Sequence, residues 1–331
     1  MTPRFGALVI SLDFEIHWGV REAVRPTGHY EKNLRGVWTA IPRMLELFEA
    51  YEVAATWATV GFLFAHSRDE ATRFAPVLKP RYLDTTLDPY QEPLGNGEAD
   101  DPFHFAPTLI DQIQATPRQE LATHTFSHYY CVEPGQDRDA FRADLQSALA
   151  IARQRGVDIR SIVFPGNQHN PTYDEVLAEV GLTCYRGTQP FWMYSTSRLS
   201  GQTYGKRASR LIDGFFRVRG DHTLAWDEVW NGGPLCNVQA SFFLRPTRPA
   251  LWRQPLRWLQ FHRIAPSIRR AAREQRIVHI WWHPHNFGGY VDANIAQLRD
   301  LLEVYRECRD RYGMQSLTMA ETAAHARGEV T

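Results

Sequence analysis

The alternation of short apolar runs with longer segments of helical period constrains this chain more than any other feature of its sequence. Residues 7–13 form an apolar, β-branched run that ends in a carboxylate, and residues 37–50 then carry apolar side chains at helical spacing. Strands that alternate with helices favour a parallel sheet, either doubly wound or closed into a barrel. The residues of chemical interest follow predicted strands, where barrel enzymes place their active sites: Asp13, His124, Pro165 and His283. We therefore predict a barrel.

The same patterns predict the remaining elements. Strands are expected at residues 53–60, 120–124, 159–164, 182–185 and 277–282, and helices at residues 105–116, 137–155, 172–180 and 294–312. The capping-box spacing of Thr318 and Glu321 predicts a final helix. Two stretches lack a clear period, residues 75–104 and residues 187–276, and the second holds short strand-like runs such as 238–244. We expect both to be insertions in a single domain, residues 1–331.

The composition excludes several classes of protein. Of the 331 residues, 44% are hydrophobic and 22% charged, as in an ordinary globular protein. The 37 basic residues balance the 37 acidic ones, which argues against a general nucleic-acid binder, and no apolar run reaches the roughly 18 residues of a membrane span. The first residues lack the pattern of a signal peptide, and the four cysteines are scattered without CxxC spacing. We therefore expect a cytoplasmic protein with reduced, buried thiols.

Two carboxylates lie at the end of the first predicted strand. Residues two apart in a strand share a face, so Asp13 and Glu15 are expected to point the same way. One carboxylate of such a pair can hold a metal while the other takes a proton. Taken alone, the pair is equally consistent with a solvent-facing strand end.

The segment His124-Thr-Phe-Ser-His128 places two histidines four residues apart. On a helical turn their imidazoles would meet on one side and could bind one metal ion in the neutral form. In a chain with 13 histidines, an isolated pair of this spacing is more often a pair of core or surface residues. The order of the motifs favours the metal: a carboxylate pair comes first, then the histidine pair, then a histidine-rich strand end.

The histidine-rich strand end is the segment His279-Ile-Trp-Trp-His283-Pro-His285. His283 follows the predicted strand, where Pro284 ends regular pairing, and can act there as a general acid. A purely structural strand end is the alternative. Pro284 should turn the chain outward, so that His285 orients the loop at 286–289 or contacts the substrate. The two intervening tryptophans are more typical of a core than of a sugar platform.

Together these segments resemble the polysaccharide deacetylases, the NodB-homology or carbohydrate esterase family 4 superfamily. Glu120-Leu-Ala-Thr-His-Thr-Phe-Ser-His128 is similar to the family's E-I-x-x-H-T-x-S-H metal motif, and Ala55-Thr-Trp-Ala-Thr-Val-Gly61 to its A-T-F-F-x-x-G strand. Ser11-Leu-Asp-Phe-Glu15 resembles the T-F-D-D-G motif, and Trp281-Trp-His283 resembles the late L-x-H motif. The resemblance, which runs in order from residue 7 to 288, implies an α/β fold, a distorted (β/α)7 barrel. It also implies a metal-dependent amidase that acts on N-acyl amino sugars, most like members that serve bacterial surface-glycan synthesis.

The resemblance also implies roles for single residues. The family's catalytic base falls on Asp13, and its general acid falls on His283. Its two metal-binding histidines fall on His124 and His128.

Two departures from the family pattern affect this site. The family's second Asp, a metal ligand, aligns with Phe14, so Glu15 is the expected third ligand. The family's Arg beside Pro, which orients the base, has no counterpart next to Pro165. The candidates to replace it are Arg160, Arg186 and Asn167.

The expected activity is removal of an N-acyl group, first of all acetyl, from an amino sugar in bacterial surface polysaccharide or lipopolysaccharide biosynthesis. Zn²⁺ is the expected cofactor, and a backbone N–H just after His128 is the expected oxyanion donor. Substrate contacts are expected from Trp18, Asn167, His285 and Asn286. The alternatives are a deformylase of a formamido sugar, a cyclic-ureide C–N hydrolase and an inactive glycan-binding barrel.

The expected partner is the amino sugar itself, either free, nucleotide-linked or lipid-linked. Residues 251–276 hold seven arginines and one acid, interleaved with aromatic residues. This segment could bind phosphates or contact an anionic membrane surface. A solvated helix face is the alternative, since the chain uses only three lysines and prefers arginine throughout. The oligomeric state is left open.

Overall fold

Strand β1 (Ala7–Phe14) is the central strand of the computed structural model, which describes residues 5–195, 198–201, 203–216, 220–248 and 254–329. All eight residues of β1 are buried, as expected for a parallel strand packed on both faces. The strand pairs with β2 (Ala55–Thr59) on one side and β8 (Ile277–Trp282) on the other, and β9 (Gln315–Leu317) pairs with its first residues. The apolar run predicted the longest strand among the described residues, and every residue in it is buried.

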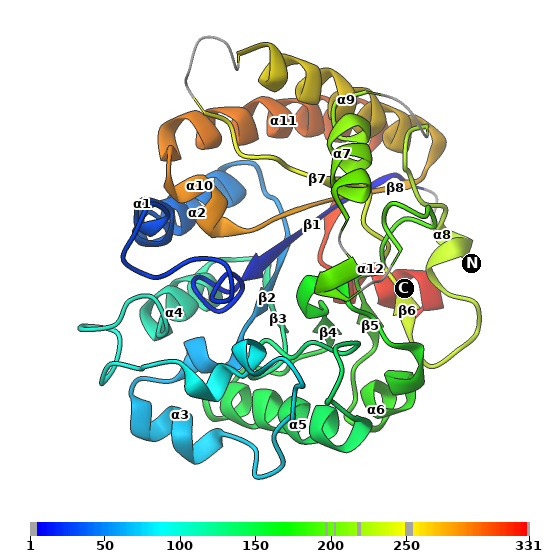
Figure 1. The fold of residues 1–331 in the computed structure, drawn as a ribbon. Coiled ribbons are helices and arrows are strands. Elements are labelled where there is room, and N and C mark those ends of the chain that lie inside the picture. The colour runs from blue at the N-terminus through cyan, green and yellow to red at the C-terminus, as the bar shows by residue number, and fades with distance from the viewer. Residues whose placement is uncertain (1–4, 196–197, 202, 217–219, 249–253, 330–331) are drawn as a thin grey trace.

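The remaining strands complete a curled sheet in which every pairing is parallel. They are β3 (Gln119–Thr123), β4 (Ser161–Ile162), β5 (Cys184–Tyr185), β6 (Cys236–Asn237) and β7 (Phe242–Phe243). The order across the sheet is β6, β5, β4, β3, β2, β1, β8, β7 (Figure 1).

One bent segment closes this sheet into a barrel. β6 pairs with β5 and β7 pairs with β8, and only residues 238–241 separate β6 from β7 in the chain. Within this link, Ala240 N donates to Gly187 O (2.9 Å) and Ser241 N donates to His279 O (2.8 Å). With β6 and β7 as two halves of one strand, the ring has the seven strands that the resemblance implies, among the described residues. The predicted distorted α/β barrel is confirmed.

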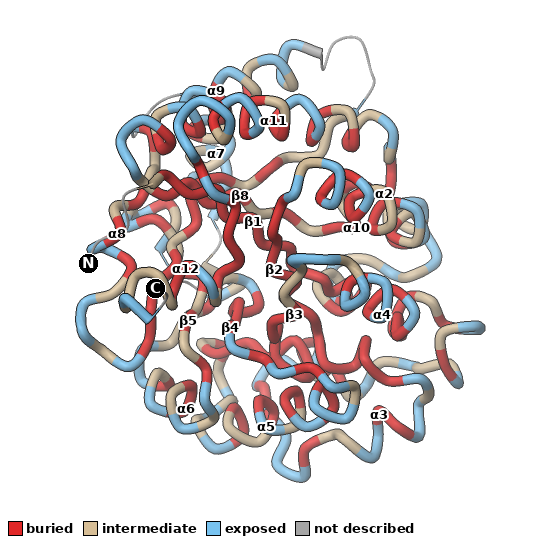
Figure 2. The backbone as a smooth tube through the Cα atoms, turned by 180° about the vertical axis from the view of Figure 1, so that it is seen from behind, coloured by how far each residue is buried: buried red, intermediate tan, exposed pale blue. Residues whose placement is uncertain are grey.

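Helices surround the strands on the outside (Figure 1). Figure 2 shows buried strands at the centre and exposed stretches mainly along the surrounding helices and loops. The helices are α1 (Glu31–Arg35), α2 (Val37–Ala50), α3 (Arg68–Phe74), α4 (Pro107–Ala115), α5 (Arg138–Gln154), α6 (Asp174–Glu179), α7 (Tyr204–Asp213), α8 (Trp226–Val229), α9 (Gln254–Glu274), α10 (Pro284–Gly288), α11 (Val291–Tyr312) and α12 (Met319–Arg327).

Alternate residues of β1 face two different cores. Leu8 and Ile10 belong to the large apolar cluster between the sheet and the helices, whereas Ala7 and Val9 belong to a smaller cluster inside the barrel. Because the side chains of a strand alternate between its faces, Asp13 continues the inner face to the mouth of the barrel.

Most predicted elements are present with small shifts at their ends. α2 spans the predicted residues 37–50, and Thr318 and Glu321 form the predicted capping box of α12. The stretch 75–104 has two short 3-10 turns, Thr85–Leu87 and Pro89–Gln91, as its helical elements. The stretch 187–276, predicted to be an irregular insertion, instead supplies β6, β7 and α9. Strands of two residues are too short for their period to be seen in the sequence.

The arginine-rich segment 251–276 forms most of α9, and residues 251–253 lie outside the described part of the chain. Ion pairs join Arg257 to Asp300 and Arg269 to Glu307 on α11, which neutralises charge that a membrane contact would use. Membrane contact through this segment stays a prediction. Across the described ranges, no helix combines the length and apolar character of a membrane span. All four cysteines are buried and free, as predicted.

The N-cap of α5 tests how local sequence stabilises the barrel. The Asp137 carboxylate accepts hydrogen bonds from the N–H groups of Asp139 (3.0 Å) and Ala140 (2.8 Å). Asp137→Ala should lower the free energy of unfolding by about 1 kcal/mol, measured by urea denaturation. Asp158→Ala removes only a surface pair with Arg160 and should cost less than about 0.5 kcal/mol. Equal losses in the two variants would contradict the capping role.

Candidate active site

Several strand ends bring polar side chains to one edge of the barrel. Because the paired strands are all parallel, their carboxyl ends lie at the same edge. Asp13 lies near the end of β1, and the other residues follow β3, β4, β5 and β8 in turn: His124, Asn167, Arg186 and His283. The edge predicted to hold the active site therefore carries the predicted residues.

Glu15 lies between the two histidines of the predicted metal motif. Its Oε2 atom is 3.1 Å from Nε2 of His124 and 3.1 Å from Nε2 of His128. All three side chains are buried, and their ligand atoms lie within 4.8 Å of one another. The three predicted metal ligands thus form a group that could hold an ion.

The hydrogen bonding of His124 fits a metal at this place. Its Nδ1 lies 2.7 Å from the carbonyl oxygen of Val163, which can only accept, so Nδ1 carries the proton. In the neutral ring Nε2 is then a bare acceptor that faces the acceptor Oε2 of Glu15. Two buried acceptors at 3.1 Å require a cation between them. Two imidazoles and a carboxylate are a donor set of Zn²⁺ sites.

Charge and burial also favour the metal-binding forms of these ligands. Burial by itself would raise the pKa of Glu15, but the charge of His283 and the close contacts with His124 and His128 hold that pKa well below its usual range. Burial lowers the pKa of His128. An ionised carboxylate and a neutral imidazole are the forms that bind metals.

The two histidines meet through a strained loop, so the predicted helical turn is wrong. Thr125 and His128 have φ values of 62° and 57°, in the left-handed region that residues other than glycine rarely adopt. The Thr123 hydroxyl accepts a hydrogen bond from Thr125 N (3.0 Å). A spacing of four residues does not distinguish a helical turn from a loop that folds back on itself.

Asp144 on α5 fastens this loop and was missed by the sequence reasoning. Its buried carboxylate accepts hydrogen bonds from Phe126 N (2.7 Å) and from the Ser127 hydroxyl, and burial raises the pKa of Asp144 to about 6. The sequence does contain a signal that could have identified Asp144. It is an acidic residue on the apolar face of the clearest predicted helix, three residues after Phe141 and next to Leu145.

Arg186 replaces the arginine that is missing beside Pro165. Its guanidinium donates to both carboxylate oxygens of Asp13 (2.6 and 2.8 Å), and also to Asn167 Oδ1 (3.2 Å). Of the three candidates, Arg160 forms a surface pair with Asp158 instead. Burial would raise the pKa of Asp13, but Arg186 holds it below its usual value, so Asp13 stays ionised.

A hydrogen-bond chain below Asp13 holds Arg186 in place. Arg186 donates to the Ser11 hydroxyl (3.0 Å), Ser11 lies 2.8 Å from His279 Nε2, and His279 Nδ1 lies 3.0 Å from Val238 O. Burial lowers the pKa of His279 to about 3, so the ring is neutral at pH 7. The guanidinium also stacks on the Trp281 ring, 4.1 Å from its centroid. Asp13, the predicted base, therefore lies above a layer of residues that hold its partner Arg186 in place.

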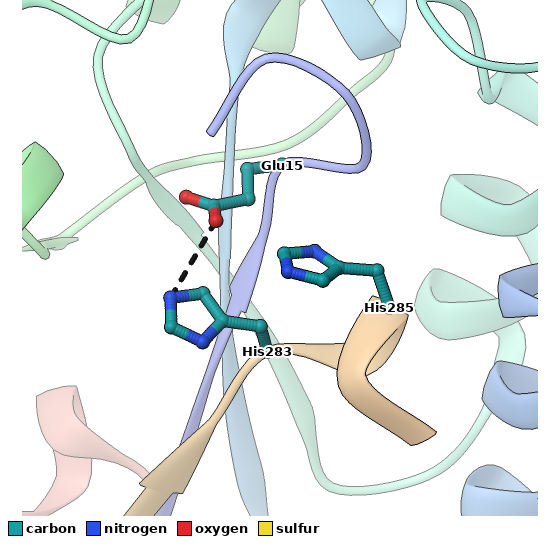
Figure 3. Close-up of side chains that lie close together, drawn as sticks. All are labelled: Glu15, His283 and His285. Atoms are coloured by element: carbon teal, nitrogen blue, oxygen red, sulfur yellow. Dashed lines mark ion pairs between the residues drawn. The ribbon is translucent and has the colours of Figure 1, made fainter. Parts of the chain in front are cut away.

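His283 faces the Glu15 carboxylate, and His285 packs beside it (Figure 3). His283 Nε2 is 3.5 Å from Glu15 Oε1 and 3.7 Å from Asp13 Oδ2. The two imidazole rings stack with centroids 5.1 Å apart, and His285 is buried. Pro284 was predicted to turn the chain outward. Instead it begins α10, which keeps His285 inside the site.

The other predicted substrate contacts have different surroundings. Trp18 is fully buried, stacks on Phe62 with centroids 4.2 Å apart, and donates to His104 O. The prediction that it contacts substrate is wrong, because its whole ring lies in the core. Asn286 accepts a hydrogen bond from the Tyr30 hydroxyl (2.9 Å), and its Nδ2 lies 3.1 Å from His283 Nδ1, so it is placed to orient that ring.

The predicted oxyanion donor is already engaged. The N–H just after His128 belongs to Tyr129 and donates to Thr125 Oγ1 (2.7 Å). Gly19 is a further residue that the sequence reasoning missed, because a Cβ there would lie 1.9 Å from the carboxyl carbon of Glu15. Glycine at this position leaves the space in which the Glu15 carboxylate lies.

A cavity of about 310 Å³ opens beside this edge. His283, Asn167 and Trp281 line one part of it. The crossover after β5 and the segment around β7 contribute three arginines and one acid: Arg207, Arg210, Arg245 and Asp213. The Nε atom of Arg245 is buried without a hydrogen-bond partner among the described residues. The cavity therefore offers positive charge beside His283, which faces Asp13 and Glu15.

No family model and no curated protein matches this sequence. Among solved structures, the fold is similar to that of a Mycobacterium smegmatis protein assigned to the polysaccharide deacetylases, with a TM-score of 0.61 and 15% identity over 99% of this chain and 93% of that one. A Pseudomonas aeruginosa PAO1 protein with the same assignment has a TM-score of 0.53 and 12% identity, over 98% of this chain and 91% of that one. Puue allantoinase has a TM-score of 0.53 and 13% identity, over 97% of this chain and 90% of that one.

These similarities cover nearly the whole of each chain. At such low identity they establish a common fold, which is the fold of the polysaccharide deacetylases that the sequence motifs resemble. The fold-level expectation from the motifs is therefore confirmed.

The pairing of Arg186 with Asp13 predicts a pH dependence of stability. In the wild type the lowered pKa of Asp13 contributes stability that is complete above its unfolded pKa and lost as the pH falls through the folded one. In Arg186→Met, burial loses its main opponent, with only His124 and His283 still lowering the pKa of Asp13. That pKa should rise, so stability should fall as the pH rises from 4 to 7, by up to about 1.4 kcal/mol per pH unit. Denaturant unfolding at several pH values measures this slope.

Two variants control this experiment. Asp13→Asn in the Arg186→Met background should remove the added slope, since the ionising group is gone. Arg160→Met breaks only a surface pair and should keep the wild-type profile. A wild-type profile in Arg186→Met would show that Arg186 does not set the charge of Asp13.

Proposed function

We propose that this chain is a metal-dependent amidase that removes an N-acyl group, acetyl in the first instance, from an amino sugar. The observation that carries the proposal is the assembly of three kinds of group at one barrel mouth. These are a metal-ligand set, an ionised carboxylate paired with arginine, and a histidine that faces both: Glu15, His124 and His128; Asp13 with Arg186; and His283.

The residues divide the hydrolysis between them. Zn²⁺ held by Glu15, His124 and His128 would supply a Lewis acid for the acyl oxygen and lower the pKa of the attacking water. Asp13 accepts the proton of that water, because Arg186 keeps its carboxylate ionised and fixed in position. His283 delivers a proton to the leaving amine, which is a poor leaving group without one.

Burial separates the roles of the two neighbouring histidines. Burial lowers the pKa of His285 to about 3, so this ring is neutral at pH 7 and has no proton to give as an acid. His283 is partly exposed and lines the cavity in which substrate would bind. We therefore assign the acid to His283, with His285 packed against it as a positioning residue.

The leaving group distinguishes the two histidines experimentally. His283→Ala should lower kcat about 100-fold or more on an acetamido sugar, with a smaller effect on an activated acetate ester, whose leaving group needs no proton. His285→Ala should lower both rates by a similar factor, because it disturbs the packing of the site. Equal losses on amide and ester in His283→Ala, or an amide-specific loss confined to His285→Ala, would overturn the assignment.

The cavity supports a substrate that carries an anionic group. Guanidinium groups bind phosphate oxygens through paired, charge-assisted hydrogen bonds, and the cavity offers Arg207 and Arg245 beside His283. We infer an amino sugar linked to a phosphate, on a nucleotide or a lipid. The motif resemblance and the buried free cysteines support a place in cytoplasmic synthesis of bacterial surface polysaccharide.

The anionic subsite predicts a selective effect on KM. Arg207→Met and Arg245→Met should each raise KM for N-acetylglucosamine 1-phosphate about tenfold and leave KM for N-acetylglucosamine within about twofold, since only the phosphate contact is lost. Arg160→Met, a surface arginine outside the cavity, should change neither value. Equal effects on the two sugars would show that these arginines do not recognise the phosphate.

A substrate panel with and without chelator tests the function as a whole. Acetylated amino sugars should be hydrolysed, chelation should abolish the activity, and Zn²⁺ should restore it. Hydrolysis confined to formamido sugars would make the chain a deformylase, and hydrolysis of cyclic ureides would place it with that class of hydrolase. Glycan binding without turnover or stoichiometric metal would indicate an inactive binding barrel.

A further inference from the structure

A second buried cluster joins the 75–104 stretch to the chain just after β1. His17 Nδ1 lies 2.8 Å from His104 Nε2, and the rings are nearly perpendicular. The carboxylate of Glu92 lies in the same group, whose ligand atoms are within 4.8 Å of one another. Both histidines are almost fully buried, and Glu92 is half-buried. None of these residues belongs to the catalytic set.

The outer nitrogens of the two rings are both committed as donors. His17 Nε2 lies 2.9 Å from the carbonyl oxygen of Val24, which can only accept. His104 Nδ1 lies 2.9 Å from both carboxylate oxygens of Asp101. In neutral rings the inner nitrogens, His17 Nδ1 and His104 Nε2, are therefore bare lone pairs that face each other. At 2.8 Å, two such acceptors need a cation between or beside them.

The surrounding charge favours a divalent cation over a proton. The cluster brings two carboxylates, Asp101 and Glu92, to the neutral rings. One shared proton would balance one of these charges, whereas a divalent ion balances both. Glu92 makes no side-chain hydrogen bond or ion pair with another described residue, so its carboxylate is available as a ligand.

We propose that His17, His104 and Glu92 hold a structural Zn²⁺ ion distinct from the catalytic one. Two imidazoles and a carboxylate suit Zn²⁺, with water as the fourth ligand. The contact from Asp101 to the outer nitrogen of His104 is the carboxylate–histidine arrangement that orients metal-binding histidines. Gly95 N donates to the same Asp101 carboxylate (2.9 Å), so this partner is itself fixed.

The position gives the ion a mechanical role. It would join three points: the exit of β1 at His17, the middle of the 75–104 stretch at Glu92, and the end of that stretch at His104. Direct hydrogen bonds reinforce the same junction, from Trp18 Nε1 to His104 O (3.1 Å) and from His17 N to Phe103 O (3.4 Å). His17 is two residues from Glu15, so the ion would also steady the turn that carries the catalytic ligand.

Metal content per chain tests the proposal, measured by plasma mass spectrometry on protein purified with zinc and passed through gel filtration. The wild type should hold about two zinc ions per chain. Glu92→Gln and His104→Gln should each hold one, His124→Ala should hold one, and Glu92→Gln combined with His124→Ala should hold none. His169→Ala removes a histidine–aspartate pair that belongs to none of the three-ligand groups among the described residues, and it should keep the wild-type content.

This design can contradict the proposal for either metal site without contradicting the proposal for the other. If Glu92→Gln and His104→Gln hold as much zinc as the wild type, the cluster binds a proton and the proposal is wrong. If His124→Ala alone keeps the wild-type content, the proposed function loses its metal while the structural site stands. Melting temperature with and without chelator gives a second readout, because each bound ion stabilises the folded chain. A chelator-dependent fall should persist in His124→Ala, be smaller than in the wild type in Glu92→Gln, and vanish in the double variant.

Discussion

Two carboxylates buried at the mouth of the barrel, on and just after its central strand, set the arrangement of everything around them. An ionised group away from water must be paired, because its desolvation costs several kcal/mol. Asp13 is paired with Arg186, which follows β5, and Glu15 is in contact with the histidines that follow β3 and β8. The compensating groups come from different strands, so the barrel must close in this register before the charges are neutralised. Fold and site therefore depend on one another.

The sequence predicted the parts of this arrangement that local pattern records. A strand-end carboxylate pair, the spacing of His124 and His128, and the position of His283 are visible as short motifs, and the structure brings them together. The parallel strands follow from their apolar runs, because buried parallel strands are apolar on both faces.

What the sequence could not predict depends on contacts between distant residues or on backbone shape. Arg186 reaches Asp13 across 173 positions, and His17 meets His104 across 87. The loop of His124 and His128 needs left-handed residues that no motif marks. Trp18 looked like a sugar-binding ring because aromatic type alone does not distinguish a binding surface from a core. The position of His285 depended on whether Pro284 turns the chain outward or begins a helix, and the sequence alone did not decide between the two.

The bent segment that carries both β6 and β7 has a consequence for how such a barrel can diversify. The crossover before it, between β5 and β6, supplies much of the cavity wall, whereas the carboxylates and histidines come from β1, β3 and β8. The register of those strands is set by the pairing of β1 with β2 and β8 and of β2 with β3, which does not involve this crossover. The crossover can therefore change length and composition, and with them the molecules admitted, while the reacting groups keep their places. The candidate reacting groups and most of the cavity wall therefore lie on separate stretches of one chain.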